Sequence, residues 1–479
     1  MTPELFKYIV MFFYLGATLW LSWLGMRKTQ TIAGFAIGNR DMSPVLVGIT
    51  LATSVASTAT FVINPGFVFV HGVSAYLHFG IAASSGILAA LILLTKGFNR
   101  IGAANGAITI PDWIQRHYGS RALTLLFALL NLLSITFVVL ILVGCSLLIA
   151  GLFPISQQLA LVLVLLFVFS YVLMGGTYAH AYTNTLQGVL MVVISIVLVV
   201  QGWHHFAGNP LATLAQFGDN YTAIYNPDSS LYYSFFSVFV SGFVITFALM
   251  MQPHILTKAL YLKSERDTRR FIWTAAIVGL IFSQMLLLGF YAKIAGIQPP
   301  SQDQVLITYL IAEYSSSALS QYFIAFVLIA LLAAGMSTLD GILVSLSAMV
   351  VNDIYSPLRN GGSTRSGLTL SRYVLVAIGI AAGALAWNPP ALVGLFAQQG
   401  VYGLGAASFV PILFGVLLRE PLSARVALSC AVVGIGGHLL SPLVFDIANP
   451  AVSATIGIAT SLSLALLALA KRTVKLGRD

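Results

Sequence analysis

The chain has 479 residues, of which 58% are hydrophobic and only 8% are charged. Soluble domains carry about 25% charged residues, so this composition excludes a cytosolic enzyme, a secreted disulfide-rich scaffold and a disordered chain. The net charge of +9 would indicate a nucleic-acid partner in a soluble protein. In a membrane protein it reflects basic residues gathered on one side, and we expect no nucleic-acid partner.

Apolar runs long enough to span a bilayer follow one another along the whole chain. Each span needs roughly 20 apolar residues, and the runs lack the period-two alternation of β-barrel strands. The sequence therefore predicts an all-α polytopic membrane protein in which about thirteen spans form a single membrane transport domain, residues 1–479. The predicted spans are residues 6–26, 45–73, 76–96, 122–152, 157–175, 184–203, 233–252, 271–295, 320–351, 371–388, 395–418, 424–443 and 452–470.

Basic residues provide an independent test of these spans. When the loops are assigned to alternating sides, all of the 23 Lys and Arg residues except Lys7 and Lys293 fall on one side. The positive-inside rule then places the N-terminus outside and the C-terminus in the cytoplasm, in the inner (plasma) membrane of the cell. Residues 97–121 are expected to form a surface helix on the cytoplasmic face, with Thr109 as its cap and Pro111 in its first turn.

The second span, residues 45–73, holds many polar residues, which are costly inside a membrane and therefore indicate function. The Pro65-Gly66 step in this span is expected to break the helix and to free carbonyl oxygens that bind a monovalent cation. The alternative is that the hydroxyls bond to carbonyls of their own helix and only ease packing. The polar residues are Thr50, Thr53, Ser54, Ser57, Thr58, Thr60 and Asn64.

The ninth span, residues 320–351, contains a second polar group. Ser337 and Thr338 place two hydroxyls within a turn of the Ala334 carbonyl. Together with two carbonyls from the broken span they complete a cage of neutral oxygens for sodium, because the negative end of a half-helix dipole supplies the missing charge. Asp340 is the only carboxylate deep in a predicted span. It is either a functional group or a residue near the cytoplasmic end that bonds to backbone or water.

Motifs of enzymes are missing from the sequence. It contains no zinc-protease helix, no nucleophile elbow and no Gly-Lys-Ser/Thr phosphate loop, which argues against an enzyme and against an ATP-driven pump. His204 and His205 lie at a membrane edge, where we expect a solvated pair and not a metal site.

Several short motifs, in order along most of the chain, resemble those of the sodium:solute symporter family and in particular its proline and pantothenate carriers. The motifs are Ile37-Gly-Asn-Arg-Asp-Met42, Thr109-Ile-Pro-Asp-Trp-Ile-Gln-Arg-His-Tyr-Gly-Ser-Arg121, Gly175-Gly-Thr-Tyr-Ala179, Thr183-Asn-Thr-Leu-Gln-Gly188, Gln252-Pro-His-Ile255 and Ala334-Gly-Met-Ser-Thr338.

The resemblance implies a leucine-transporter type of core. In that fold, five-plus-five inverted repeats, here residues 45–203 and 233–418, follow one leading helix at 6–26 and precede two trailing helices at 424–470. The second and ninth spans meet at the family's sodium site. The groups that this resemblance assigns to Na⁺ are the carbonyls of Thr53, Ala56 and Ala334 and the hydroxyls of Ser337 and Thr338.

The combined prediction is a sodium-coupled symporter, functional as a monomer, that imports a small organic solute by alternating access with Na⁺ as the co-transported ion. A carboxylate-bearing metabolite is favoured, and Ser57, Asn64 and Gln252 are candidate substrate contacts beside the break in the second span. The alternatives are proton coupling through Asp340 on the same fold, an uncoupled channel and a membrane sensor.

Two departures from the family bear on specificity and stoichiometry. Relatives carry Asp at the positions of Val55 and Asn184, and both replacements remove a negative charge. They argue against proline as the solute and against a second sodium, so we expect one sodium ion per solute. In the alternative, Thr183, Asn184 and Gln187 form a neutral second cage.

Overall fold

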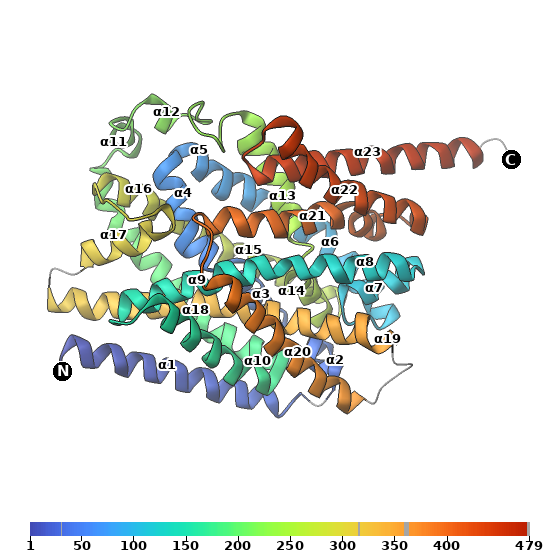
Figure 1. Cartoon of the computed structure of the whole chain (residues 1–479), viewed down its shortest axis with the longest axis horizontal. Helices are drawn as coiled ribbons and strands as arrows, with labels where there is room; N and C mark the ends of the chain where they lie inside the picture. Colours follow the sequence, from blue (N-terminus) through green and yellow to red (C-terminus); the bar gives the residue numbers. More distant parts are fainter. Residues whose placement is uncertain (30, 315–316, 359–363, 477–479) are drawn as a thin grey trace.

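The computed structural model describes residues 1–29, 31–314, 317–358 and 364–476, and these segments are helical apart from short connections (Figure 1). Within these ranges no strand forms beyond one isolated bridge. The described residues form 11 helices that are long and apolar enough to cross a membrane, and two bent helix pairs raise the number to 13. The all-α fold and the number of spans predicted from the sequence are confirmed.

Most spans cross without a sharp bend, and several of them combine consecutive helical segments. These spans are α1 (Pro3–Met26), α5 to α6 (Val73–Asn105), α8 to α9 (Arg121–Leu152), the two halves of α10 (Gln157–Gly202), α15 to α16 (Thr268–Ile294), α18 (Ala318–Met349), α20 (Thr364–Ala386), α21 (Val393–Leu417), α22 (Ala424–Phe445) and α23 (Pro450–Leu476).

Two spans are interrupted near their middle. The first changes direction by 52° between α3 and the following segment, and the second changes direction by 66° between α13 and α14. Interrupted helices leave backbone groups without helical partners, which a membrane protein tolerates only where other protein groups or water satisfy them. The segments of the two bent pairs are α3 (Pro44–Val55), η2 (Ala59–Ile63) and α4 (Asn64–His71), then η6 (Phe236–Val240), α13 (Ser241–Leu249), α14 (Pro253–Leu256) and η7 (Thr257–Tyr261).

The two halves of α10 join at Gly176, whose backbone angles of φ 52° and ψ −134° favour glycine. A side chain there would place its Cβ 2.4 Å from the ring of Phe35, so the close approach also requires glycine. The predicted gap between residues 175 and 184 is therefore wrong, because the helix resumes at 176. Polar residues in this stretch such as Thr177 and Thr183 are buried inside the protein and do not interrupt the helix.

The two ends of the molecule carry different connecting elements. In Figure 1 the N-terminus lies at the same end as α11 (Pro210–Ala215), α12 (Asp219–Thr222) and α17 (Val305–Tyr314). The opposite end carries α7 (Ile110–Tyr118), α19 (Ser356–Leu358) and the last turns of α23.

The surface helix predicted at residues 97–121 is shorter in the structure. Transmembrane helix α6 continues to Asn105 and ends at Gly106, which has the left-handed conformation typical of helix ends. The surface helix α7 then begins where predicted, because the Thr109 hydroxyl accepts a hydrogen bond from the Asp112 N–H at 3.1 Å. The sequence thus identified the cap correctly but placed the start of the helix too early.

Candidate functional site

The break in the first bent span lies directly after α3. Ala56 leaves the helical region with φ −86° and ψ 75°. The N–H of Ser57 then bonds to the Val55 carbonyl at 3.1 Å instead of to residue 53, and the Ser57 hydroxyl accepts from the Ala59 N–H at 3.1 Å. Ser57 therefore caps the next helical segment.

The predicted break at the Pro65-Gly66 step is wrong, since both residues lie inside α4. Pro65 occupies the first turn of that helix, where a missing N–H costs little. Gly66 serves close packing, because a Cβ there would lie 2.2 Å from the Gln302 carbonyl oxygen. The Pro-Gly step thus marks a contact between α4 and η10 (Gln302–Gln304) and not the break itself.

The carbonyls at the end of α3 accept hydrogen bonds from α18. The Ser337 hydroxyl lies 3.0 Å from the Thr53 carbonyl oxygen and 2.7 Å from the Ala334 carbonyl oxygen. The Thr338 hydroxyl lies 3.0 Å from the Ser54 carbonyl oxygen and 3.4 Å from that of Thr53. The two polar groups that the sequence singled out in separate spans are therefore in direct contact.

This cluster of oxygens is suited to a monovalent cation. The side chains of Thr53, Ser337 and Thr338 are completely buried, so water does not compete for the oxygens. The cluster lies at the C-terminal end of α3, where the helix dipole is negative and favours a cation. Ala56, which was expected to contribute its carbonyl, is the first residue past α3, and the two hydroxyls donate to Thr53 and Ser54 instead.

A chain of polar side chains lies behind the oxygen cluster. Asn184 donates its amide to the Ser337 carbonyl at 3.1 Å, and His180 Nε2 lies 3.4 Å from the Ser54 hydroxyl. The other ring nitrogen of His180 pairs with the Asp340 carboxylate at 2.6 Å. The Tyr171 hydroxyl also donates to Asp340, at 3.3 Å. The cluster is thus connected to a buried ion pair.

Asp340 is completely buried and paired with His180, so the reading in which it bonds to backbone or water near a helix end is wrong. Sequence analysis missed His180 because it lies in the stretch that was predicted to be a gap between spans. A histidine between the motifs Gly175-Gly-Thr-Tyr-Ala179 and Thr183-Asn-Thr-Leu-Gln-Gly188 was the available signal. Its carboxylate partner is 160 residues away in the sequence and could not be inferred locally.

A cavity of about 410 Å³ lies beside the break and is lined by residues of both bent spans. Asn64 and Gln252, two of the three predicted substrate contacts, line it, but Ser57 does not. The Gln252 side-chain oxygen and both ring nitrogens of His254 are buried without a hydrogen-bond partner among the described residues. Buried polar atoms are normally paired, so these groups are available to a solute.

The second bent span brings two further polar residues, His254 and Lys258, which the sequence analysis did not single out as site residues. His254 lies on α14, which Gln252 precedes, and it lines the cavity. Lys258 on η7 is completely buried, and its ammonium group donates to the His254 carbonyl. A lysine within a helical segment of a span was the signal that could have identified this region.

The residues proposed as a neutral second cage donate their protons to separate partners. Thr183 donates its hydroxyl to carbonyls of its own helix, at 3.0 Å from Ala179 and 3.2 Å from His180. Gln187 donates instead to the Tyr14 hydroxyl at 3.0 Å. Because Asn184 directs its amide to Ser337, the three side chains serve three different contacts.

Known proteins resemble this chain over most of its length. The sequence model of the sodium:solute symporter family matches residues 35–434. The sodium/pantothenate symporter of Haemophilus influenzae is 26% identical over 446 residues, which cover 90% of this chain and 88% of that protein. The sodium/proline symporter of Escherichia coli K12 is 25% identical over 454 residues, with 90% of this chain and 86% of that protein covered.

A solved structure shares the fold. The substrate-bound outward-open state of a Na⁺-coupled sialic acid symporter matches with a TM-score of 0.78 at 17% sequence identity, and the match covers 96% of each chain. The predicted transporter type of fold is thereby confirmed.

The buried contact between His180 and the Asp340 carboxylate generates a stability prediction. His180→Leu leaves the buried carboxylate with only the longer hydrogen bond from Tyr171 among the described residues, and we expect a loss of about 3–5 kcal/mol, the usual cost of breaking a buried pair. The measurement is the midpoint of thermal unfolding in detergent. His438→Leu, which removes a buried histidine that bonds to the Gln399 carbonyl and to Ser453, is the matched control and should cost less.

The double variant His180→Leu/Asp340→Asn separates charge from packing. It should unfold at a higher temperature than His180→Leu alone, because no unpaired charge remains buried. Equal unfolding temperatures for the single and double variants would contradict a buried charge on Asp340.

Proposed function

The chain belongs to the sodium:solute symporter family, and from that premise we propose that Na⁺ binds between α3 and α18 and drives the import of a carboxylate-bearing solute. Sodium and solute cross the membrane together in this family of secondary transporters. The observation that carries the proposal is the contact of the Ser337 and Thr338 hydroxyls with the Thr53 and Ser54 carbonyls at the end of α3.

Bound sodium would replace the hydrogen bonds that now join α18 to α3. The hydroxyls would keep their protons and bind the ion through their oxygens. The carbonyls of Thr53 and Ala334 and the hydroxyls of Ser337 and Thr338 are the proposed ligands, and the distances of 2.7–3.4 Å among them require only small shifts. Ala56 remains a proposed carbonyl ligand because of its position at the break. The ion stabilises the arrangement in which α3 stays against α18.

The cavity beside the break is the proposed solute site. Its volume of about 410 Å³ lies within the usual range of ligand pockets, about 300–1,000 Å³. Asn64, Gln252 and His254 offer amide and imidazole groups to a carboxylate. Ser54 lines the cavity, and its carbonyl accepts from the hydroxyl of Thr338, a proposed sodium ligand, so solute and ion would act on the same end of α3.

Binding of ion and solute to one helix end explains their coupling. If sodium raises solute affinity, the solute must raise sodium affinity by the same factor. The carboxylate preference has independent support from the names of the relatives, which transport pantothenate and proline. Replacement of the acidic residue by Val55 argues against proline itself.

The remaining features of the proposal concern the placement of the chain. We place the N-terminus outside and the C-terminus in the cytoplasm of the plasma membrane, as the distribution of basic residues favours. The inverted repeats would be residues 45–203 and 233–418, each of which contains one bent span. The protein acts as a monomer and transports its solute without chemical change.

Proton coupling is the second candidate mechanism, because Asp340 pairs with a histidine that could share a proton. Asp340 does not line the cavity among the described residues, so a proton would have to reach it through His180. Uptake that a pH gradient drives in sodium-free buffer would favour this mechanism over sodium coupling.

The first functional prediction concerns the sodium ligands. Ser337→Ala and Thr338→Ala each remove one oxygen, and a loss of about 1–3 kcal/mol raises the sodium concentration for half-maximal uptake about 5- to 150-fold. Ser347→Ala is the matched control, since Ser347 is buried on the same helix and donates only to its own helix, to Val344 at 3.0 Å. Unchanged sodium dependence in the double variant Ser337→Ala/Thr338→Ala would refute the site.

The second prediction identifies the solute. A thermal-shift screen of small carboxylates with the purified protein should find compounds that stabilise it more in sodium than in potassium. A ligand at about 100 times its Kd contributes about 2.7 kcal/mol. Gln252→Leu should weaken this stabilisation, whereas Gln284→Leu, outside the cavity, should not. Stabilisation by amines or sugars alone would contradict the carboxylate assignment.

The third prediction is a stoichiometry of one sodium per solute. Asn184 has no charge and donates to Ser337, while Thr183 and Gln187, also uncharged, donate to other partners. Each unpaired charge inside the membrane costs several kcal/mol, so a second ion should not bind there. Uptake should follow sodium concentration with a Hill coefficient near one, and a reversal-potential measurement that gives a ratio of two would overturn the prediction.

A further inference from the structure

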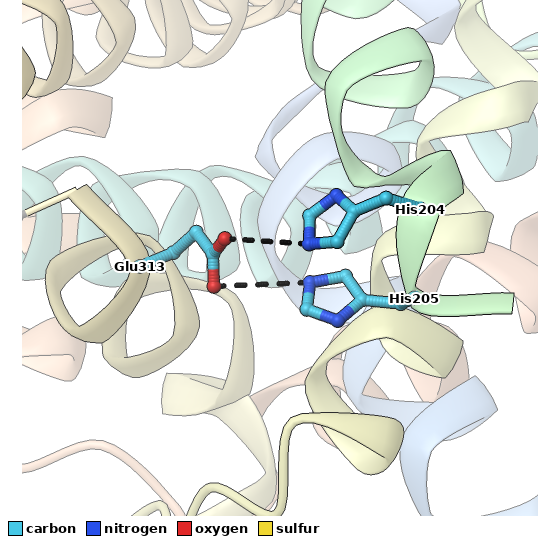
Figure 2. A group of neighbouring side chains, drawn as sticks. All are labelled: His204, His205 and Glu313. Carbon is cyan, nitrogen blue, oxygen red and sulfur yellow. Dashed lines mark ion pairs between the residues drawn. The ribbon is translucent and has the colours of Figure 1, made fainter. Parts of the chain in front are cut away.

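Three potential metal ligands meet at the outer end of the molecule. His204 and His205 lie in η5 (Trp203–Phe206) after α10, and Glu313 lies on α17 (Figure 2). The Glu313 carboxylate faces both rings, at 3.8 Å from His204 Nε2 and 3.7 Å from His205 Nε2. The sequence-based expectation of a solvated pair is wrong for His205, whose side chain is only 11% exposed.

The tautomer of His204 leaves its ligand atom free. Its Nδ1 lies 2.6 Å from the Gln201 carbonyl, which can only accept a hydrogen bond, so Nδ1 carries the proton. In the neutral ring, Nε2 is then unprotonated, and its lone pair is directed at Glu313 (Figure 2). Histidines that bind metals usually donate their second nitrogen to a carbonyl or carboxylate in this way.

His204 Nε2 and the Glu313 carboxylate are both acceptors, and acceptors repel one another unless a proton or a cation lies between them. His204 Nε2, His205 Nε2 and a Glu313 oxygen all lie within 4.8 Å of one another. Tetrahedral ligands at about 2.0–2.1 Å from a metal are about 3.3 Å apart, so closure requires small rotations. Among the described residues, the Tyr309 hydroxyl competes for this position, at 3.1 Å from His205 Nε2. A hydrogen bond of this kind contributes about 1 kcal/mol.

We propose that His204, His205 and Glu313 bind a first-row divalent metal ion of the Zn²⁺ type. Two imidazoles and one carboxylate are the ligand set that such ions prefer. The His204 side chain is 63% exposed, so solvent can reach the site and supply the fourth ligand. None of the groups takes part in the sodium site or the cavity.

The bound metal would restrain the outer end of the first bent span. It joins α17 to α10, which Tyr314 already connects through a bond of 2.9 Å to Gln201. Helix α17 packs against η2 and α4, the outer half of the span that breaks after α3. A metal that fixes α17 therefore opposes movement of that half-span, and transport should slow. This consequence rests on the proposed function, whereas metal binding itself does not.

The first test measures binding without transport. Co²⁺ added to the purified protein, free of any histidine tag, should produce the visible absorption of a tetrahedral site, and Zn²⁺ should displace it. His205→Ala and Glu313→Gln should weaken Co²⁺ binding more than about 100-fold, since even outer partners of metal ligands contribute about 10- to 100-fold. His71→Gln is the matched control, because this imidazole lies on the outer side beside Ser229, away from the cluster.

A variant that changes the metal selectivity of the site distinguishes loss of a ligand from misfolding. His204→Cys replaces one ligand by a softer one and should raise the preference for Cd²⁺ over Zn²⁺ at least tenfold. Absence of the Co²⁺ absorption, or equal binding by wild type and the His205→Ala/Glu313→Gln variant, would overturn the site.

The second test measures whether a metal bound at this site restrains α17 and slows transport. Zn²⁺ on the outer side of proteoliposomes should inhibit sodium-driven uptake, and His205→Ala/Glu313→Gln should take up solute normally but lose the inhibition. Zn²⁺ binding without inhibition would overturn the restraint of α17. Failure of sodium-driven uptake in all variants, with Co²⁺ binding intact, would refute the proposed transport function and not the metal site.

Discussion

The constraint on which this structure depends is that carbonyls freed inside a membrane need partners. A peptide carbonyl in an apolar environment costs several kcal/mol when it is left unpaired. The end of α3 exposes the carbonyls of Thr53 and Ser54, and in the described part of the chain Ser337 and Thr338 on α18 donate to them. This requirement holds α18 against α3 and places the neighbouring cavity beside the break. The carbonyls that lack helical hydrogen-bond partners thus form a set of oxygens that a cation can bind.

The buried ion pair adds a second connection between the same helices. Asp340 lies on α18 only two residues beyond Thr338, and His180 lies on α10 next to the Ser54 hydroxyl. The pair fits because position 341 is glycine, where a Cβ would lie 2.8 Å from the His180 ring. Movement of α3 relative to α18 would therefore disturb His180 as well. The ion pair and the oxygen cluster respond to the same displacement.

The parts of the fold that could be predicted depend on local sequence. Apolar runs identify the spans because a bilayer imposes length and hydrophobicity. Adjacent Ser337 and Thr338 could be recognised because polar groups in a span are rare. The position of the break could not be predicted, since Pro65 fits the first turn of α4 and the helix ends earlier, where contacts with α18 replace its own hydrogen bonds.

Residues whose partners are distant in the sequence were also missed. His180 pairs with a carboxylate 160 residues away, and Glu313 joins the two histidines only through the folding of the outer loop. His254 can be recognised as a candidate solute contact only once the cavity that it lines is known. Polar residues in these stretches were visible, but their roles follow from tertiary contacts that no spacing rule contains.

The separation of Thr53 from its partner on α18 has a consequence for biosynthesis. The two residues are 284 positions apart, and ribosomes add about 5–20 residues per second, so α18 is made about 15–60 s after α3. During that interval the end of α3 is already synthesised but its permanent hydrogen-bond donors do not exist. Water, lipid headgroups or the insertion machinery must satisfy these carbonyls until α18 arrives. The oxygen cluster is therefore assembled late, and a chain interrupted before residue 338 contains the break but not the site.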